Sequence, residues 1–329
     1  MTESLTDSHG RRIDYLRISI TDRCNLRCRY CMPAQGVPKL RHEEMLSYEE
    51  LLRLTRLLVS MGISKIRITG GEPLVRKGVL FFCGNVAKLP GIRSVSLTTN
   101  GVLLNRFAEG LLRSGIQRIN ISLDSLDRGK FASITRSDCF DEVWRGILKA
   151  SELGLSPVKL NTVVMRGVND DEIEELAKLT FDHSFHVRFI ELMPMNGERA
   201  DALFVSSDEI LDRLSAMGPL SPVKSNHSNG PARHYQFHGA EGKVGIISPV
   251  SHHFCPSCNR LRLTADGKLR TCLFAAEETD LRSDLRQGAS DDKLLGKIRS
   301  AVLAKPERHT LALGGVRKCI SRPMVAIGG

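Results

Sequence analysis

The feature that most constrains the fold of this chain is an alternation of short β-branched runs with stretches of helical period. The runs with strand character are residues 15–21, 65–69, 94–100, 118–124, 158–164 and 186–192. The connections between them are long enough for helices, which is typical of repeated strand–helix–strand units around a parallel sheet. Because six such units occur, and not eight, we predict an α/β fold with an incomplete (β/α)6, TIM-like barrel.

Local signals mark where two of the helices begin and end. Ser47 followed by Glu50 has the spacing of a capping box, and Gly62 follows the apolar stripe as a stop signal. Asn169 and Glu172 have the same spacing ahead of a second stripe. We therefore predict a capping box at both places.

The strands alternate between apolar and polar side chains, although strands buried on both faces are usually apolar throughout. The polar positions are Arg17, Ser19, Arg67, Thr69, Ser96, Thr98, Asn120, Ser122, Lys159 and Asn161. If helices cover the outside, this face points into the barrel, where unpaired cations are costly. The pattern then predicts an anionic ligand at the carboxyl ends of the strands. The alternative is an antiparallel sheet with one solvated face, which needs no ligand.

The pattern changes after about residue 215, where short strands and turn signals replace the long units. The tripeptide at 265–267, ADG, predicts a hairpin turn. We expect two domains, a barrel at 1–215 and a smaller C-terminal α+β domain at 216–329. The sequence contains neither a P-loop nor a dinucleotide-binding glycine motif.

Composition restricts the setting and the partners. The 329 residues carry a net charge of +10, which allows nucleic acid, an acidic membrane surface or a small anion as partner. No apolar run approaches the length that spans a bilayer, and the first residues lack a signal peptide, so we expect a cytoplasmic protein. Nine cysteines in a reducing compartment indicate metal ligation or burial. Cys83, Cys139 and Cys319 fit no motif, and we expect them to be structural.

A first triad, Cys24, Cys28 and Cys31, follows the first strand with the spacing CxxxCxxC. A zinc site completed by His42 is one possibility. A [4Fe-4S] cluster takes four thiolates when complete, so three would leave one iron open to an exogenous ligand. The position of this loop, where barrels hold their active sites, favours the open cluster.

A second triad, Cys255, Cys258 and Cys272, begins with CxxC. A zinc ribbon that borrows its fourth ligand is the alternative. Beside the first triad, a second open iron–sulfur cluster is the favoured interpretation.

The first triad resembles that of the radical S-adenosylmethionine (SAM) superfamily, in which the open iron chelates SAM and reduction yields a 5′-deoxyadenosyl radical. TGGEP at 69–73 resembles the superfamily's methionine-binding motif. Within it, the chain resembles one family, the GTP 3′,8-cyclases, also called molybdenum cofactor biosynthesis protein A. The resemblance covers nearly the whole chain and is most specific in FCPSCNRLRLTADG, at 254–267, and in the terminal Gly-Gly.

The resemblance assigns roles to individual residues. The two triads would each hold a [4Fe-4S] cluster. The residues implied around SAM are Tyr30, Gly71, Ser122 and Met193. The residues implied around GTP are Arg17, Arg67, Thr98, Lys159, Arg260, Leu261 and Arg262. The residues implied at the catalytic centre itself are Arg260, Arg262, Gly328 and Gly329, the two glycines as a tail that reaches toward it.

The implied activity is cyclisation of GTP to (8S)-3′,8-cyclo-7,8-dihydroguanosine 5′-triphosphate, the first step of molybdenum cofactor biosynthesis. The radical would take hydrogen from ribose C3′, and the carbon radical would add to guanine C8. The implied partners are an electron donor such as flavodoxin or ferredoxin, cyclic pyranopterin monophosphate synthase downstream, and a second copy in a homodimer. Neither a membrane nor a nucleic acid is expected.

Two other functions remain open from the sequence. One is a radical SAM peptide-modifying enzyme with an auxiliary cluster, although such enzymes usually carry more auxiliary cysteines. The other is a zinc-stabilised nucleic-acid-binding protein, which would bind with a steep dependence on salt. Its weakness is that the cations alternate along strands and form no surface stripe.

Overall fold

The protein is built around one open, curved sheet. The computed structural model describes residues 4–194, 201–223, 230–309 and 322–328. Within these residues, eight neighbouring strands run parallel, in the spatial order β10 (Arg260–Leu263), β1 (Tyr15–Ser19), β2 (Lys65–Thr69), β3 (Ser94–Thr99), β4 (Arg118–Ser122), β5 (Lys159–Val164), β6 (His186–Glu191) and β9 (Lys243–Ile247). The prediction of parallel strand–helix units is confirmed, and the antiparallel alternative is wrong.

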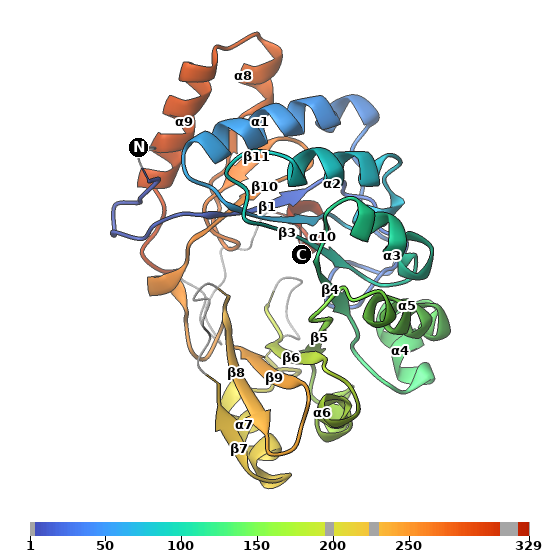
Figure 1. The fold of residues 1–329 in the computed structure, drawn as a ribbon. Coiled ribbons are helices and arrows are strands. Elements are labelled where there is room, and N and C mark those ends of the chain that lie inside the picture. Colours follow the sequence, from blue (N-terminus) through green and yellow to red (C-terminus); the bar gives the residue numbers. More distant parts are fainter. Residues whose placement is uncertain (1–3, 195–200, 224–229, 310–321, 329) are drawn as a thin grey trace.

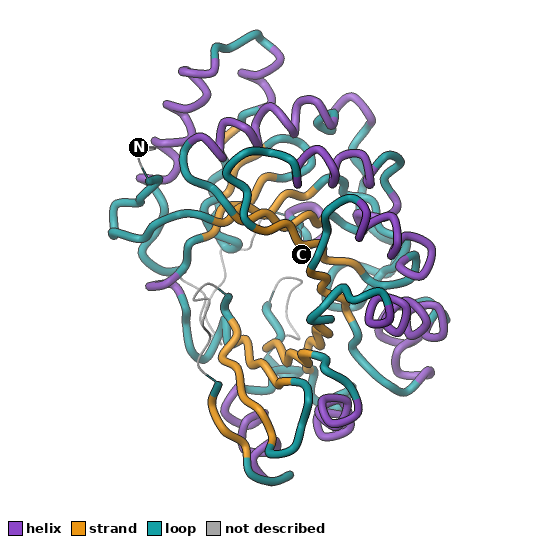
Figure 2. Tube along the Cα trace, viewed as in Figure 1, coloured by secondary structure: helices purple, strands orange, loops and turns teal. Residues whose placement is uncertain are grey.

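Helices cover the convex side of this sheet, and the strands curve around a central space (Figures 1 and 2). Those that follow the barrel strands are α1 (Tyr48–Ser60), α2 (Val79–Ala87), α3 (Leu104–Arg113), α4 (Arg128–Thr135), α5 (Phe140–Glu152) and α6 (Ile173–Asp182). The later ones are α7 (Ser207–Ala216), α8 (Arg282–Arg286), α9 (Asp291–Leu303) and α10 (Met324–Ile327). In the described ranges, none of these helices combines the length and the apolar character that crossing a membrane would require.

Antiparallel strands extend the sheet at both edges. At one edge, β8 (Ala232–Phe237) pairs with β9, and β7 (Leu220–Pro222) pairs with β8. At the other, β11 (Lys268–Arg270) pairs with β10, and β12 (Thr279–Asp280) pairs with β11. The turn between β10 and β11 contains the predicted glycine, Gly267, with φ at +76°. The segment after 216 therefore continues the sheet of the first segment, and the division at 215 stays a prediction.

The two predicted capping boxes have different outcomes. Ser47 accepts from the backbone of Glu50, whose side chain accepts from Ser47, so the first box is confirmed. The second is wrong: the Asn169 side chain makes no capping bond. Its amide instead donates to the carbonyl of Asp124, 2.6 Å away, while the Glu172 carboxylate accepts from the Ser125 hydroxyl. Both side chains tie the α6 region to the end of β4.

The apolar face of the strands forms the main core against the helices. Its strand members include Ile18, Ile68, Leu97, Ile121 and Leu160, all fully buried. The polar side chains of the same strands therefore face the concave side, as the alternation predicts.

Candidate active site

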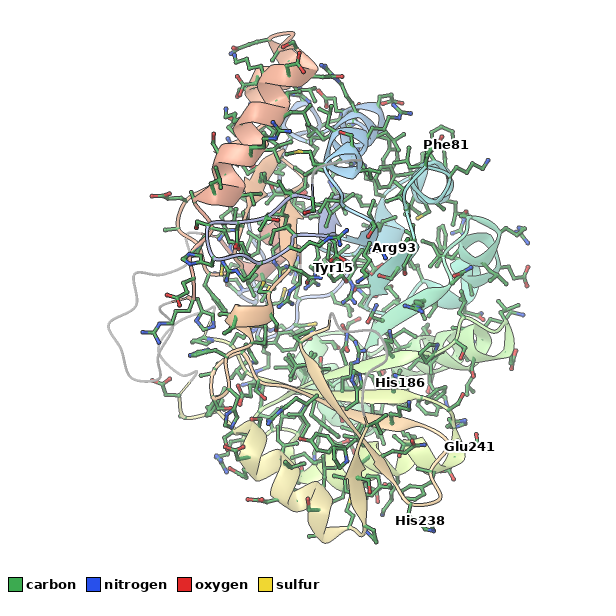
Figure 3. The ribbon with its side chains drawn as sticks, turned by 60° about the vertical axis from the view of Figure 1, so that its left-hand side comes forward. Tyr15, Phe81, Arg93, His186, His238 and Glu241 are labelled. Carbon is green, nitrogen blue, oxygen red and sulfur yellow. The ribbon has the colours of Figure 1, made fainter. Side chains whose placement is uncertain are left out.

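A cavity of about 810 Å³ occupies the concave side of the sheet, and both cysteine triads line it. Its walls include side chains from strands far apart in the sheet, such as Tyr15 on β1 and His186 on β6, which Figure 3 labels. The lining contains nine lysines or arginines among the described residues, and Asp124 is their only acidic counterpart. The positive charge predicted for the interior is therefore concentrated here.

The first triad lies on the loop after β1. The backbone N–H of Cys31 donates to the carbonyl of Cys28, 2.9 Å away, so the loop turns tightly between these two ligand positions. Burial raises the pKa of Cys24 to about 11 and that of Cys31 to about 12, and it raises the pKa of Cys28 well above its usual value. Three closely grouped, desolvated thiols fit a cluster that binds them as thiolates.

The glycines of the TGGEP motif allow the end of β2 to touch this loop. A Cβ on Gly71 would lie 2.5 Å from the carbonyl oxygen of Arg23, so only glycine fits there. The N–H of Gly71 donates to Thr21 (2.7 Å), and that of Glu72 donates to Arg23 (2.8 Å). The motif therefore holds the cysteine loop against the strand ends.

The residues implied around SAM are all part of the cavity lining, namely Tyr30, Gly71, Ser122 and Met193. The Tyr30 hydroxyl donates to Asp124 at 2.8 Å, and burial raises the pKa of Asp124 to about 6. A polar group therefore stands next to the triad in a desolvated setting.

Three arginines lie side by side across neighbouring strands. Arg17 on β1 is in register with Arg262 on β10 and with Arg67 on β2. Burial lowers the pKa of Arg17 well below its usual value, and the charges of Arg262 and Arg67 add to this effect. Adjacent like charges on one face are destabilising without a counterion, so the row favours a bound anion.

Other polar groups continue the row toward β6. Thr98 and Lys159 line the cavity as predicted, and burial lowers the pKa of Lys159 to about 7. Among the described residues that line the cavity, the buried polar atoms without a hydrogen-bond partner include Nε of Arg67, Oγ1 of Thr98, Oδ1 of Asn161, Nδ1 of His186 and Nε of Arg188. Buried polar groups normally have partners, so these atoms fit a polar ligand that completes them.

The sequence interpretation missed several cations of this cavity, namely Lys65, Arg118, Arg188 and Lys243. Arg188 is the most buried of them, 8% exposed, and burial lowers its pKa to about 10. It lies between Val187 and Phe189, which are buried in the core. The same alternation that identified Arg17 would therefore have identified it.

The second triad lies on the loop before β10 and at the end of β11. Cys255, Cys258 and Cys272 all line the cavity, as do Arg260 and Arg262. Burial alone would raise the pKa of Cys258, but the cations of Arg260 and Lys305 outweigh it and lower the pKa to about 7. Leu261, in contrast, packs in the core with no exposed surface, and its side chain is not part of the cavity lining.

The C-terminal tail reaches the row of arginines. Arg262 donates to the carbonyl oxygen of Gly328 at 2.7 Å. Gly328 has φ of +78°, and a Cβ there would lie 3.0 Å from the side chains of Ser19 and Thr69. Gly329 lies outside the described residues, as does Cys319.

Cys83, Cys139 and His42 lie apart from the cavity lining. Cys83 and Cys139 are buried in the core, as expected. His42, proposed as a zinc ligand, is exposed and does not line the cavity. In the parts of the chain that the structure covers, no three His, Cys, Asp or Glu side chains are placed to share a single metal ion. A [4Fe-4S] cluster instead binds each thiolate to a different iron atom.

Comparisons with known families match almost the whole chain. Residues 18–180 match the Radical SAM superfamily, and residues 185–311 match the family described as Molybdenum Cofactor Synthesis C. Among solved structures, Streptococcus suis SuiB bound to precursor peptide SuiA has a TM-score of 0.62, with 16% identity over 91% of this chain and 72% of that chain. At that identity the similarity concerns the fold alone.

Curated relatives are far more similar. A GTP 3′,8-cyclase of Thermodesulfovibrio yellowstonii is 50% identical over 99% of this chain and all of that protein. One from Moorella thermoacetica is 48% identical with the same coverage, and one from Geobacter sulfurreducens is 51% identical over 94% of each chain. The protein therefore belongs to the GTP 3′,8-cyclase family of radical SAM enzymes.

Proposed function

We propose that this chain converts GTP to (8S)-3′,8-cyclo-7,8-dihydroguanosine 5′-triphosphate in the cavity between its two triads, as the first step of molybdenum cofactor biosynthesis. The observation that carries the proposal is the arrangement of that cavity. Two groups of three thiols line one cavity, together with nine cationic side chains. Membership of the GTP 3′,8-cyclase family supports the same assignment.

In this proposal the first triad, Cys24, Cys28 and Cys31, holds a [4Fe-4S] cluster with one open iron. When bound there, such a cluster would supply the electron that cleaves SAM to methionine and the 5′-deoxyadenosyl radical. Tyr30, Gly71, Ser122 and Met193 surround SAM, and Gly71 lets the cysteine loop approach the end of β2 closely. Burial of this side of the cavity keeps water away from the radical path.

GTP binds across the concave face of the sheet. The cations of Arg17, Arg67 and Lys159 bind its triphosphate, and Arg188 adds a fourth charge from β6. Thr98 offers a hydroxyl that has no partner within the described residues. Cys255, Cys258 and Cys272 would hold the second cluster, which would supply an open iron for the guanine. The chain's contribution is to place ribose C3′ and guanine C8 together.

Arg260, Arg262 and the tail complete the catalytic centre. Arg260 and Arg262 line the cavity next to the second triad, and Arg262 also binds the Gly328 carbonyl. The described tail reaches Arg262 through Gly328, and we expect it to exclude water from the reacting atoms. Leu261 contributes through its backbone, because its side chain is buried in the core.

The electron donor docks on the loop that carries the first triad. Residues 23–42 contain no acidic side chain, and Arg23, Arg27, Arg29 and Lys39 are exposed around the cysteines. Such a basic rim fits the acidic surface of a flavodoxin or ferredoxin. Reversing Arg23 and Arg29 to Glu should slow reduction by flavodoxin and leave reduction by dithionite unchanged. Equal rates with flavodoxin would contradict this docking site.

The other partners follow from the reaction. Its product passes to cyclic pyranopterin monophosphate synthase, and we place both proteins in the cytoplasm. We also propose that the chain forms a homodimer, which sedimentation measurements test.

Anaerobic reconstitution tests the proposed activity. We expect about eight irons per chain, four for each cluster. Incubation with SAM, GTP and dithionite should then release 5′-deoxyadenosine in a GTP-dependent manner and yield the cyclised nucleotide. Protein that contains zinc in place of iron, or that leaves GTP unchanged, would contradict the proposal.

A further inference from the structure

Lys305 is a buried lysine at the second triad to which neither the motif comparison nor the cavity assigns a role. It follows α9 and is only 3% exposed. Lysine is rarely buried this completely unless its ammonium has a specific partner.

The ammonium of Lys305 contacts both arms of the second triad. It lies 3.6 Å from the sulfur of Cys258 and 3.2 Å from the carbonyl oxygen of Arg260. It also donates to the carbonyl of Thr271, the residue before Cys272. An ammonium has three N–H donors, so these contacts use all of them.

The position of Lys305 separates it from the substrate-facing cations. Arg260 and Arg262 line the cavity, whereas Lys305 does not. Within the described ranges, no carboxylate forms an ion pair with it. The ammonium of Lys305 therefore contacts the sulfur of Cys258 without being part of the cavity lining.

A second buried cation fixes this arrangement. The guanidinium of Arg11 donates to the carbonyl of Cys255 at 3.0 Å and to those of Pro306 and Glu307, each at 2.7 Å. The segment after Lys305 is thus attached to the same loop that carries Cys255 and Cys258. Lys305 has little freedom to swing away from the cysteines.

We propose that Lys305 is a positioning residue that holds Cys258 as a cluster ligand and raises the reduction potential of the second cluster. The inference rests on the proposed function, since it requires a cluster at this triad. Reduction adds one negative charge to a cluster, and a fixed cation with an N–H···S contact stabilises the reduced form. The first triad has the opposite neighbours, the buried carboxyl groups of Glu72 and Asp124.

The test isolates the second cluster in a chain with Cys24→Ala, Cys28→Ala and Cys31→Ala. Its potential is measured by a redox titration followed by electron paramagnetic resonance, without SAM or GTP. We expect Lys305→Met and Lys305→Gln to shift the reduction equilibrium at least tenfold toward the oxidised form, which is 59 mV for one electron. Lys305→Arg should stay within about threefold, because it keeps the charge.

Lys268→Met is the matched control. Lys268 lies on β11, close to the triad in sequence, but its ammonium pairs with Asp280 at 2.6 Å. Its loss should leave the potential unchanged.

An unchanged potential in Lys305→Met and Lys305→Gln, with the cluster fully loaded, would overturn the inference alone. Folded Met and Gln variants that lose their iron while Lys305→Arg keeps it would support the ligand-holding role. If Lys305→Arg lost the cluster or the fold as much as the Met and Gln variants, the proposal that the charge of Lys305 is what matters would be overturned. Zinc or no iron in the triple-alanine parent would overturn both this inference and the proposed function.

Discussion

The two cysteine triads present the same three donors in opposite electrostatic surroundings. Beside the first, the buried carboxyl groups of Glu72 and Asp124 act on the thiols from within the fold, and burial raises the pKa of each thiol. Beside the second, Arg260 and Lys305 lower the pKa of Cys258 to about 7. Ligand identity therefore does not by itself determine how a cluster behaves. The surrounding charges set how readily each triad ionises and how easily its cluster is reduced.

The largest expected effect separates the triads by function. Cys24→Ala removes a ligand of the first cluster, so 5′-deoxyadenosine should fall below detection. Cys258→Ala should still cleave SAM, because the triphosphate still binds Arg17, Arg67 and Lys159, but it should form no cyclised nucleotide, because the guanine loses its anchor. Chromatography of both products, with iron analysis, measures this difference. Cys83→Ala, in the core of α2, is the control and should retain both reactions. Loss of SAM cleavage in Cys258→Ala would mean that the triads do not act separately.

The next effect concerns the three neighbouring arginines in the cavity, Arg17, Arg67 and Arg262. Arg17 stands between Arg262 and Arg67, and Arg17→Met should weaken GTP binding by about 2–5 kcal/mol, roughly 30- to 5,000-fold. Calorimetry on the reconstituted protein measures the affinity. Arg113→Met, an exposed arginine on α3, should leave it unchanged. If SAM affinity fell as much as GTP affinity, the three neighbouring arginines would not be specific to the triphosphate.

Local patterns predicted the parallel strands, both triads and three of the nine cations in the cavity lining, Arg17, Arg67 and Lys159. They did not predict how distant segments meet. Tyr15 pairs with Arg260 across nearly the whole chain, and no local signal carries such a pairing. Asn169 and Glu172 had the spacing of a capping box, but their side chains found partners at the end of β4 instead. Lys305 belongs to no motif, so its role depends entirely on the contacts that folding creates.

A smaller effect tests the electrostatic contrast in the cluster-free protein. At pH 7, about half of Cys258 should be thiolate, against a very small fraction of Cys24, whose pKa is about 11. After allowing for the lower nucleophilicity of the less basic thiolate, iodoacetamide should modify Cys258 about 100-fold faster. Mass spectrometry of timed samples measures both rates. Lys305→Met should slow the modification of Cys258 and leave the modification rate of Cys24 unchanged. Similar modification rates at Cys258 and Cys24 would contradict the electrostatic difference between the two triads.

The smallest effect is the pH dependence of GTP binding at Lys159, on β5. Burial, followed by the charge of Arg188, lowers its pKa to about 7, so above pH 7 the free site is mostly neutral. A triphosphate favours the ammonium and raises that pKa, so binding takes up a proton. GTP affinity should therefore fall as pH rises above 7, by at most about tenfold per pH unit. Calorimetry between pH 7.5 and 9, in buffers of different ionisation enthalpy, measures the affinity and the proton uptake. Lys159→Arg keeps the charge at every pH, so its slope should flatten. An unchanged slope in that variant would assign the proton to another group, and the charge at Lys159 would then be constant, like those of the arginines around it.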